Sequence, residues 1–138
     1  RLMLLGQGAK EATLRAMAAE LGIADRVIFA GFHPDPTPFY KTANLFVLSS
    51  DYEGLPTVLI EALGCGTPVV STDCPSGPAE ILENGKSGRL VPVRDPQALT
   101  GAMQSALTES HDTDLLKTRA ADFAPAIAAK RYLELLCL

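Results

Sequence analysis

The sequence has no tryptophan, only three cysteines and no apolar run near the ~20 residues of a membrane-spanning helix. Cys65, Cys74 and Cys137 are odd in number and lack the spacing of a zinc site, so we expect free thiols in a reducing compartment. Positive charge is not in excess either, because 12 basic and 16 acidic side chains give a net charge of −4. Because the chain has no excess of positive charge to attract a nucleic-acid backbone, we expect no nucleic-acid partner.

The composition that is present is that of a globular domain. The chain is 47% hydrophobic and 20% charged, and its 138 residues suit a single domain spanning 1–138. It begins at Arg1, inside an expected strand and without an initiator methionine. We therefore expect this domain to be a piece of a longer protein.

Short apolar runs alternate with amphipathic segments along the whole chain. Strands are expected at 2–5, 27–29, 45–48, 68–72 and 89–91, and helices after Gly8 to Leu21, at 39–43, 57–64 and 78–82, from 96, and from 112 with a break near 123–125. The 45–48 run is apolar throughout, which predicts a strand buried on both faces, and the nearly all-apolar 57–64 helix is also expected to be buried. The alternation predicts an α/β fold, a Rossmann-like parallel sheet with helices on both faces.

Ligands bind such sheets beyond the carboxyl ends of the strands. The loops expected there are 6–8, 30–38, 49–56 and 72–77, and three prolines between 34 and 38 favour irregular structure in the second of them. Gly6-Gln7-Gly8 begins like a dinucleotide fingerprint, but Glu11 stands where the third glycine belongs, so the fingerprint is incomplete. Asp95, followed by Pro96, is expected to cap the helix that begins at 96. Asp112 and Asp114 we also interpret as a helix cap, in preference to a metal site.

Glu53 and Glu61 flank an expected junction between a loop and a helix, with seven residues between them. Thr57 and Glu61 are four residues apart and share one helix face, and the first-turn amides from Thr57 to Ile60 are expected to lack intrahelical acceptors. Such a helix start suits a phosphate, and Glu61 would accept hydrogen bonds from ribose hydroxyls. From spacing alone a second interpretation stays open, in which Glu53 is solvated and Glu61 pairs with a nearby cation.

Several segments resemble the retaining glycosyltransferases of family 4, which have the GT-B fold. The strongest is SDYEGLPTVLIEALGCGTPVV at 50–70, and DCPSGPAEIL at 73–82, VIFAGF at 27–32 and the glycine pair at 6–8 agree with it. The resemblance covers roughly residues 1–109 and implies the C-terminal, donor-binding half of a GT-B enzyme. It also implies that the first strand of this half, with a basic pair for the diphosphate, and an N-terminal acceptor domain precede Arg1.

The resemblance assigns roles to the paired-glutamate segment. Glu61 would hold the ribose hydroxyls of the donor nucleotide. Glu53 is the candidate catalytic residue, facing the donor sugar as a positioning and electrostatic partner and not as a nucleophile. The backbone of Gly54, Leu55 and Thr57 would bind the sugar and the diphosphate.

Two further segments receive donor-binding roles from the resemblance. The main chain of Gly31 and Phe32 would hold the base, with a plain strand-ending turn as the alternative. Gly6 and Gly8 would lie near the cleft.

The implied activity is that of a hexosyltransferase, which moves a hexose from a nucleotide-diphosphate sugar, with UDP as the expected nucleotide, to an acceptor hydroxyl. The acceptor would be a glycan or a lipid-linked sugar in polysaccharide biosynthesis, and retention would proceed by front-face attack. The resemblance implies no metal and no other cofactor. It further implies a cytoplasmic protein whose full-length form can associate peripherally with the inner face of the membrane, and a fragment that is inactive alone.

Two other classes of function remain open from the sequence. Another GT-B enzyme, such as a sugar-nucleotide epimerase, would bind the same nucleotide and convert the donor without an acceptor. A non-catalytic, flavodoxin-like binding module would show no nucleotide preference and no effect of changing Glu61.

Overall fold

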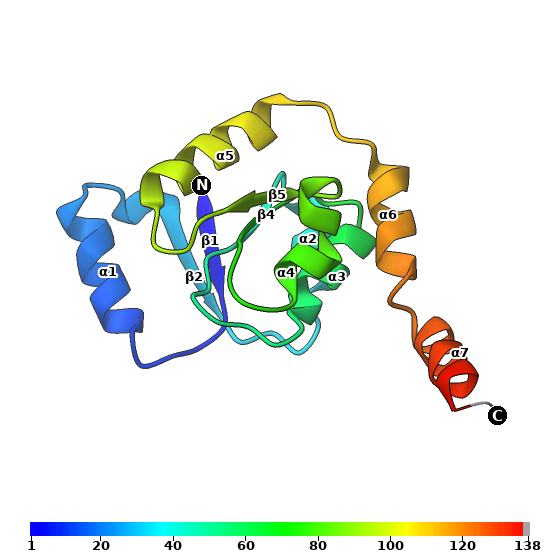
Figure 1. The fold of residues 1–138 in the computed structure, drawn as a ribbon. Coiled ribbons are helices and arrows are strands. Elements are labelled where there is room, and N and C mark those ends of the chain that lie inside the picture. Colours follow the sequence, from blue (N-terminus) through cyan, green and yellow to red (C-terminus); the bar gives the residue numbers. More distant parts are fainter. Residues whose placement is uncertain (137–138) are drawn as a thin grey trace. The chain divides into compact units, whose positions relative to one another are not determined.

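The computed structural model describes residues 1–136. The chain forms two compact units, one of residues 1–36 and one that begins at Thr37. Each unit is a parallel α/β arrangement (Figure 1). Cys137 lies outside the described residues, while Cys65 and Cys74 are free thiols, as expected. No helix within 1–136 has the length and apolar character needed to cross a membrane.

The first unit is a two-stranded parallel sheet with one covering helix. Its elements are β1 (Leu2–Leu5), α1 (Glu11–Glu20), a 3-10 turn (Ala24–Arg26) and β2 (Val27–Gly31). Leu2 is paired with Val27, and the register shifts after Leu4. The sequence places Leu14, Met17, Ala18 and Leu21 on one side of α1, and this side is only partly buried: Ala18 is buried, whereas Leu14 is 41% and Met17 51% exposed. A two-stranded sheet is too narrow to cover the whole apolar stripe of a helix.

The second unit is built on a three-stranded parallel sheet in the order β3-β4-β5, namely Phe46–Leu48, Val69–Thr72 and Arg89–Val91. Its helices are α2 (Thr37–Thr42), α3 (Thr57–Gly64), α4 (Pro78–Ile81), α5 (Pro96–Thr108), α6 (Thr113–Ala121) and α7 (Pro125–Leu135), with a 3-10 turn at Glu83–Gly85. The helix α2 begins inside the stretch expected to be a loop, because proline is tolerated in a first helical turn and Pro38 occupies one.

Burial in this unit is centred on β4, with the core on the α3 side of the sheet. Every residue of β4 is buried, whereas β3 is only half-buried along its length, which contradicts the expectation for 45–48. Val69 joins a cluster with Leu59 and Leu63 from α3, while α5 packs against β4 and β5. Helices therefore flank the sheet, as predicted (Figure 1).

The helix α3 is buried on one side and exposed on the other, although its sequence is almost uniformly apolar. Leu59, Ala62 and Leu63 are fully buried, but Thr57 and Glu61 are exposed on the opposite side. The expectation of a buried helix therefore holds for one side of α3 and not for the other. One side of α3 packs on the core and the other carries its polar residues to the surface.

Two aspartates cap helices as expected. Asp95 accepts a hydrogen bond from the Ala98 amide at 2.8 Å at the start of α5. Asp112 accepts from the amides of Asp114 and Leu115 at 3.0 and 3.1 Å at the start of α6. The capping interpretation of Asp112 is confirmed.

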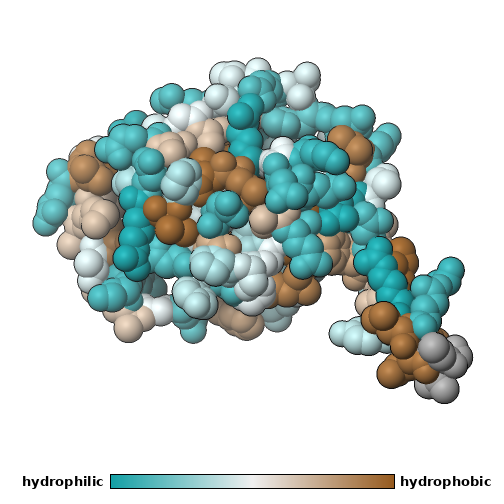
Figure 2. Space-filling model, in the orientation of Figure 1, coloured by the Kyte–Doolittle hydropathy of each residue, from teal (hydrophilic) through white to brown (hydrophobic). Residues whose placement is uncertain are grey.

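The helix α7 follows the break at Pro125 and contains no buried residue. Tyr132 is 69% and Leu135 79% exposed, and Figure 2 shows brown apolar side chains beside teal polar ones on this helix. Its apolar side thus faces solvent.

Candidate functional site

In each unit the residues singled out in the sequence lie at the end of a strand, in a loop that follows one or, for Thr57 and Glu61, in the helix that comes after such a loop. The first unit holds Gly6, Gly8, Gly31 and Phe32, and the second holds Glu53, Gly54, Leu55, Thr57 and Glu61. In each unit this is the sheet edge at which parallel α/β folds bind ligands.

In the first unit the structure brings Gly6 to the end of β2. The Gly6 amide donates to the Gly31 carbonyl at 2.8 Å, and both glycines have positive φ, 117° and 74°. Only glycine adopts such angles without strain, which explains both residues as strand-ending turns. Phe32 is 68% exposed beside them. The base-binding and cleft roles stay predictions.

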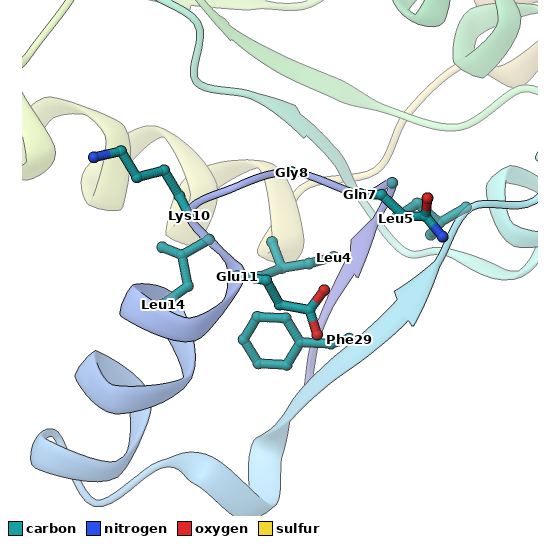
Figure 3. Close-up of a pocket in the computed structure, with 9 residues that line it drawn as sticks. Leu4, Leu5, Gln7, Gly8, Lys10, Glu11, Leu14 and Phe29 are labelled. Carbon is teal, nitrogen blue, oxygen red and sulfur yellow. The ribbon is translucent and has the colours of Figure 1, made fainter.

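A shallow hollow of about 260 Å³ lies against this turn (Figure 3). Leu4, Leu14 and Phe29 supply an apolar wall, and Gly6 and Gly8 form its rim. A Cβ atom added at either glycine would meet nothing within 4 Å, so the backbone there is open to close approach.

In the second unit the loop that bears Glu53 is held by the loop that follows β4. The Ser76 hydroxyl donates to the Glu53 carbonyl at 3.0 Å and lies 3.4 Å from the Gly54 carbonyl. The Thr72 hydroxyl, at the end of β4, donates to the Ser50 carbonyl at 2.5 Å. The 49–56 segment is therefore fixed through its backbone, which leaves the Glu53 side chain and the surface of Gly54 available.

A third loop at the same edge adds an ion pair. Arg94, which follows β5, places its Nε 2.8 Å from the Asp51 carboxylate. Both side chains are largely exposed, so the ion pair contributes little to stability. The backbone of Arg94 has φ of 57°, a left-handed conformation that is uncommon for residues other than glycine.

The start of α3 presents backbone donors at this edge. Pro56 is the N-cap residue and no side chain caps the helix. The Leu59 amide donates to the Pro56 carbonyl at 3.0 Å, so the expectation of free amides through Ile60 was too broad. The amides of Thr57 and Val58 have no acceptor within 1–136, and the positive end of the helix dipole lies beside them.

Glu61 lies one turn further along α3 with its carboxylate exposed. The buried Tyr40 hydroxyl donates to Glu61 Oε2 at 3.2 Å. Within the described residues no cation pairs with this carboxylate, which contradicts the alternative of a salt bridge. Burial, and then the neighbouring Glu61 charge, raise the pKa of Tyr40 above its ordinary value, so the phenol stays a donor.

Several residues that support this edge were not singled out from the sequence. Tyr40 lies on a short helix 21 residues before Glu61, and no spacing links the two. Arg94 has no sequence signal either. Ser76 lies within the quoted DCPSGPAEIL segment, so its polar position between two prolines was the available clue.

The part of the chain that the structure describes contains no group of three or more His, Cys, Asp or Glu side chains placed to hold a metal ion. The expected chemistry without a metal stays a prediction. A second hollow, of about 340 Å³, lies near Lys86, Arg89 and His111 at the amino ends of β4 and β5, away from the edge described above.

Solved structures with this fold are GT-B glycosyltransferases. The lipopolysaccharide outer core galactosyltransferase WaaB, in its apo form, is 27% identical with a TM-score of 0.83 over 96% of this chain and 39% of its own. A chain of Anabaena HepE, described in complex with UDP, is 24% identical with a TM-score of 0.80 over 99% of this chain and 40% of its own, which shows the fold alone.

The family model for glycosyl transferases group 1 matches residues 1–123, and the chain belongs to this family. The lipopolysaccharide core biosynthesis glycosyltransferase LpsE of Rhizobium meliloti is 36% identical over 121 residues, which are 88% of this chain and 34% of that protein. The chain thus spans about a third of the length of this curated relative.

Proposed function

We propose that this chain is the donor-binding domain of a retaining family 4 glycosyltransferase that uses a UDP-sugar. The observation that carries the proposal is the arrangement on α3, where the open amides of Thr57 and Val58 begin the helix and the Glu61 carboxylate is exposed one turn later without a cation. A nucleoside diphosphate matches both ends, because its phosphates accept from amides and its ribose hydroxyls donate to a carboxylate.

On this proposal each part of the donor is bound by a different group of residues at this edge. Glu61 accepts from the ribose hydroxyls, and the α3 amides with the helix dipole hold the diphosphate. The backbone of Gly54 and Leu55 lies against the sugar, and Glu53 orients the sugar hydroxyls. As the glycosidic bond to the diphosphate breaks, negative charge grows on the leaving phosphate, and donors fixed in advance stabilise it.

The remaining parts of the reaction belong to the whole protein. On this proposal the base rests on the main chain of Gly31 and Phe32, and Gly6 and Gly8 lie near the cleft. The acceptor, a glycan or lipid-linked sugar, binds an N-terminal domain, and a hexose passes to its hydroxyl by front-face attack, without metal. The lipopolysaccharide relative supports a place in surface polysaccharide assembly. On this proposal the whole protein works in the cytoplasm, at the inner face of the membrane.

A further strand completes the donor domain on this proposal. Within 1–136, β3 pairs with β4 alone, so its other edge carries unpaired backbone groups. Such an edge accepts another strand, and the first strand implied by the family resemblance would pair there.

Replacing Glu61 by alanine is expected to weaken UDP binding about tenfold without unfolding the chain, because an exposed carboxylate that holds the ribose is lost. NMR titration of the labelled chain with UDP, ADP and GDP measures this. With the unaltered chain, shifts should cluster at 53–61 and be strongest for UDP. Glu20→Ala, which removes an exposed glutamate at the end of α1, is the control and should bind like the unaltered chain. Equal UDP affinity for Glu61→Ala and the control contradicts the ribose role.

In the full-length enzyme, Glu53→Gln should lower kcat on the order of a hundredfold while changing the Kd for UDP little, since Glu53 faces the sugar and not the nucleotide. Steady-state transfer kinetics and UDP calorimetry separate the two quantities. An equal loss in both would place Glu53 on the nucleotide. Product formation without any acceptor would favour epimerase chemistry instead.

A further inference from the structure

The Glu61 carboxylate is anchored from beneath by a buried side chain of another helix. Tyr40 on α2 is 7% exposed, and its hydroxyl donates to Glu61 Oε2 at 3.2 Å, while the Glu61 side chain itself is exposed. Within 1–136 the other carboxylate oxygen, Oε1, has no hydrogen-bond or ion-pair partner. One oxygen is therefore engaged toward the protein and one remains for a ligand.

Tyr40 is itself held on three sides. Its ring meets the Phe46 ring edge-on at 5.4 Å between centroids and belongs to the core cluster that contains Leu59 and Leu63. Its backbone carbonyl accepts a hydrogen bond of 2.7 Å from the buried Thr67 hydroxyl, in the turn between α3 and β4. The phenol oxygen consequently has a fixed position relative to α3.

The chemistry of the contact has a defined direction. Desolvation, followed by the Glu61 charge, raises the pKa of Tyr40, so the phenol remains protonated through neutral pH and donates to an ionised carboxylate. A hydrogen bond to a charged acceptor is stronger and more directional than one between neutral groups. It restricts the rotation of a glutamate side chain that otherwise carries several rotamers at a surface.

We infer that Tyr40 is a positioning residue for nucleotide binding, which holds Glu61 Oε2 so that Oε1 is presented to the ribose hydroxyls of a nucleoside diphosphate. This inference rests on the proposed function. It differs from a purely structural role, in which Glu61 would only satisfy a buried phenol and the ligand would gain nothing from the contact.

Tyr40→Phe tests the inference, because it keeps the ring in the core and removes only the hydroxyl. Two quantities are measured by NMR on the chain: the rotamer averaging of the Glu61 side chain, from scalar couplings without ligand, and the Kd for UDP and for 2′,3′-dideoxyuridine diphosphate. Tyr132→Phe, on the exposed surface of α7, is the matched control.

With Tyr40→Phe we expect Glu61 to average among rotamers and UDP to bind roughly three- to tenfold more weakly, with the dideoxy nucleotide changed by less than about twofold. General loosening of the core would weaken the binding of both nucleotides. A loss of affinity for UDP alone therefore depends on the ribose hydroxyls. The Tyr132→Phe control should match the unaltered chain in both quantities.

Three outcomes overturn the inference. Unchanged Glu61 averaging and unchanged UDP affinity in Tyr40→Phe, together with a loss in Glu61→Ala, would leave the proposed function intact and remove the role of Tyr40. Equal losses for both nucleotides would assign Tyr40 to core packing alone. Unchanged UDP binding in Glu61→Ala would contradict the proposed function first and the role of Tyr40 with it.

Discussion

Replacing Gly77 by alanine is expected to destabilise the second unit by about 2–4 kcal/mol and to weaken nucleotide binding by about tenfold or more. Gly77 has φ of 88° and ψ of −68°, a conformation that residues with a Cβ rarely adopt. An alanine Cβ would also lie against Pro56 Cδ and 2.5 Å from the Gly54 carbonyl oxygen. Because backbone and a proline ring cannot give way locally, the loop that bears Glu53 must move.

Gly101→Ala is the matched control for this change. Gly101 lies inside α5, where an added Cβ meets nothing within 4 Å, so alanine should stabilise that helix by about 0.5–1 kcal/mol. Denaturant unfolding and the UDP titration are run on both variants. Unaltered stability and UDP affinity in Gly77→Ala would show that the two loops separate freely and would contradict the close packing described here.

Replacing Leu59 by alanine is expected to cost about 2–5 kcal/mol of unfolding free energy. Leu59 is fully buried on α3, in the cluster formed with Leu63, Val69 and Ile81. Removing most of its side chain leaves a cavity between α3 and the sheet that neighbouring groups fill only in part. Hydrogen exchange of the β4 amides, read alongside denaturant unfolding, reports the loss in the unit concerned.

Leu107→Ala is the control for the core substitution. Leu107, in the last turn of α5, is 55% exposed, so its truncation should change the free energy of unfolding by less than about 0.5 kcal/mol. Equal effects of the two substitutions would mean that the α3 face does not form the core of this unit.

Local signals in the sequence predicted the helix boundaries best where a breaker or a cap was present. The helix α3 begins at Thr57 and ends at Gly64 as expected, because Pro56 starts it and the turn at Gly66 follows it. Asp95 and Asp112 marked the starts of α5 and α6 through their side-chain oxygens. Such signals depend on interactions within a few residues, so they can be predicted from the sequence.

Burial was harder to predict because it depends on which elements are neighbours. The apolar run at β3 suggested a strand enclosed on both faces, yet β4 is the fully buried strand and β3 is half-buried. The stripe on α1 was identified, but its Met17 stays exposed. Periodicity shows which residues share a side, and only the tertiary arrangement determines what covers that side.

The candidate site shows the same division. Glu53, Gly54 and Glu61 could be chosen from one continuous segment, since loop and helix follow each other directly. The partners that fix them could not, because Tyr40 and Ser76 reach them across 21 and 23 residues. The expected roles of these residues came from the family resemblance. Their positions are fixed by hydrogen bonds between loops, which only the structure shows.

The Ser76 hydroxyl, which donates to the Glu53 carbonyl and lies near that of Gly54, bears on how related enzymes diverge in the sugar they accept. If Glu53 faces the sugar, its height above the sheet is set by a hydroxyl from a different loop. Exchange of residues in 73–77 can then shift sugar preference while the paired glutamates stay unchanged. Substitutions that change which donor is preferred can therefore occur in the 73–77 loop as well as among the residues that face the sugar.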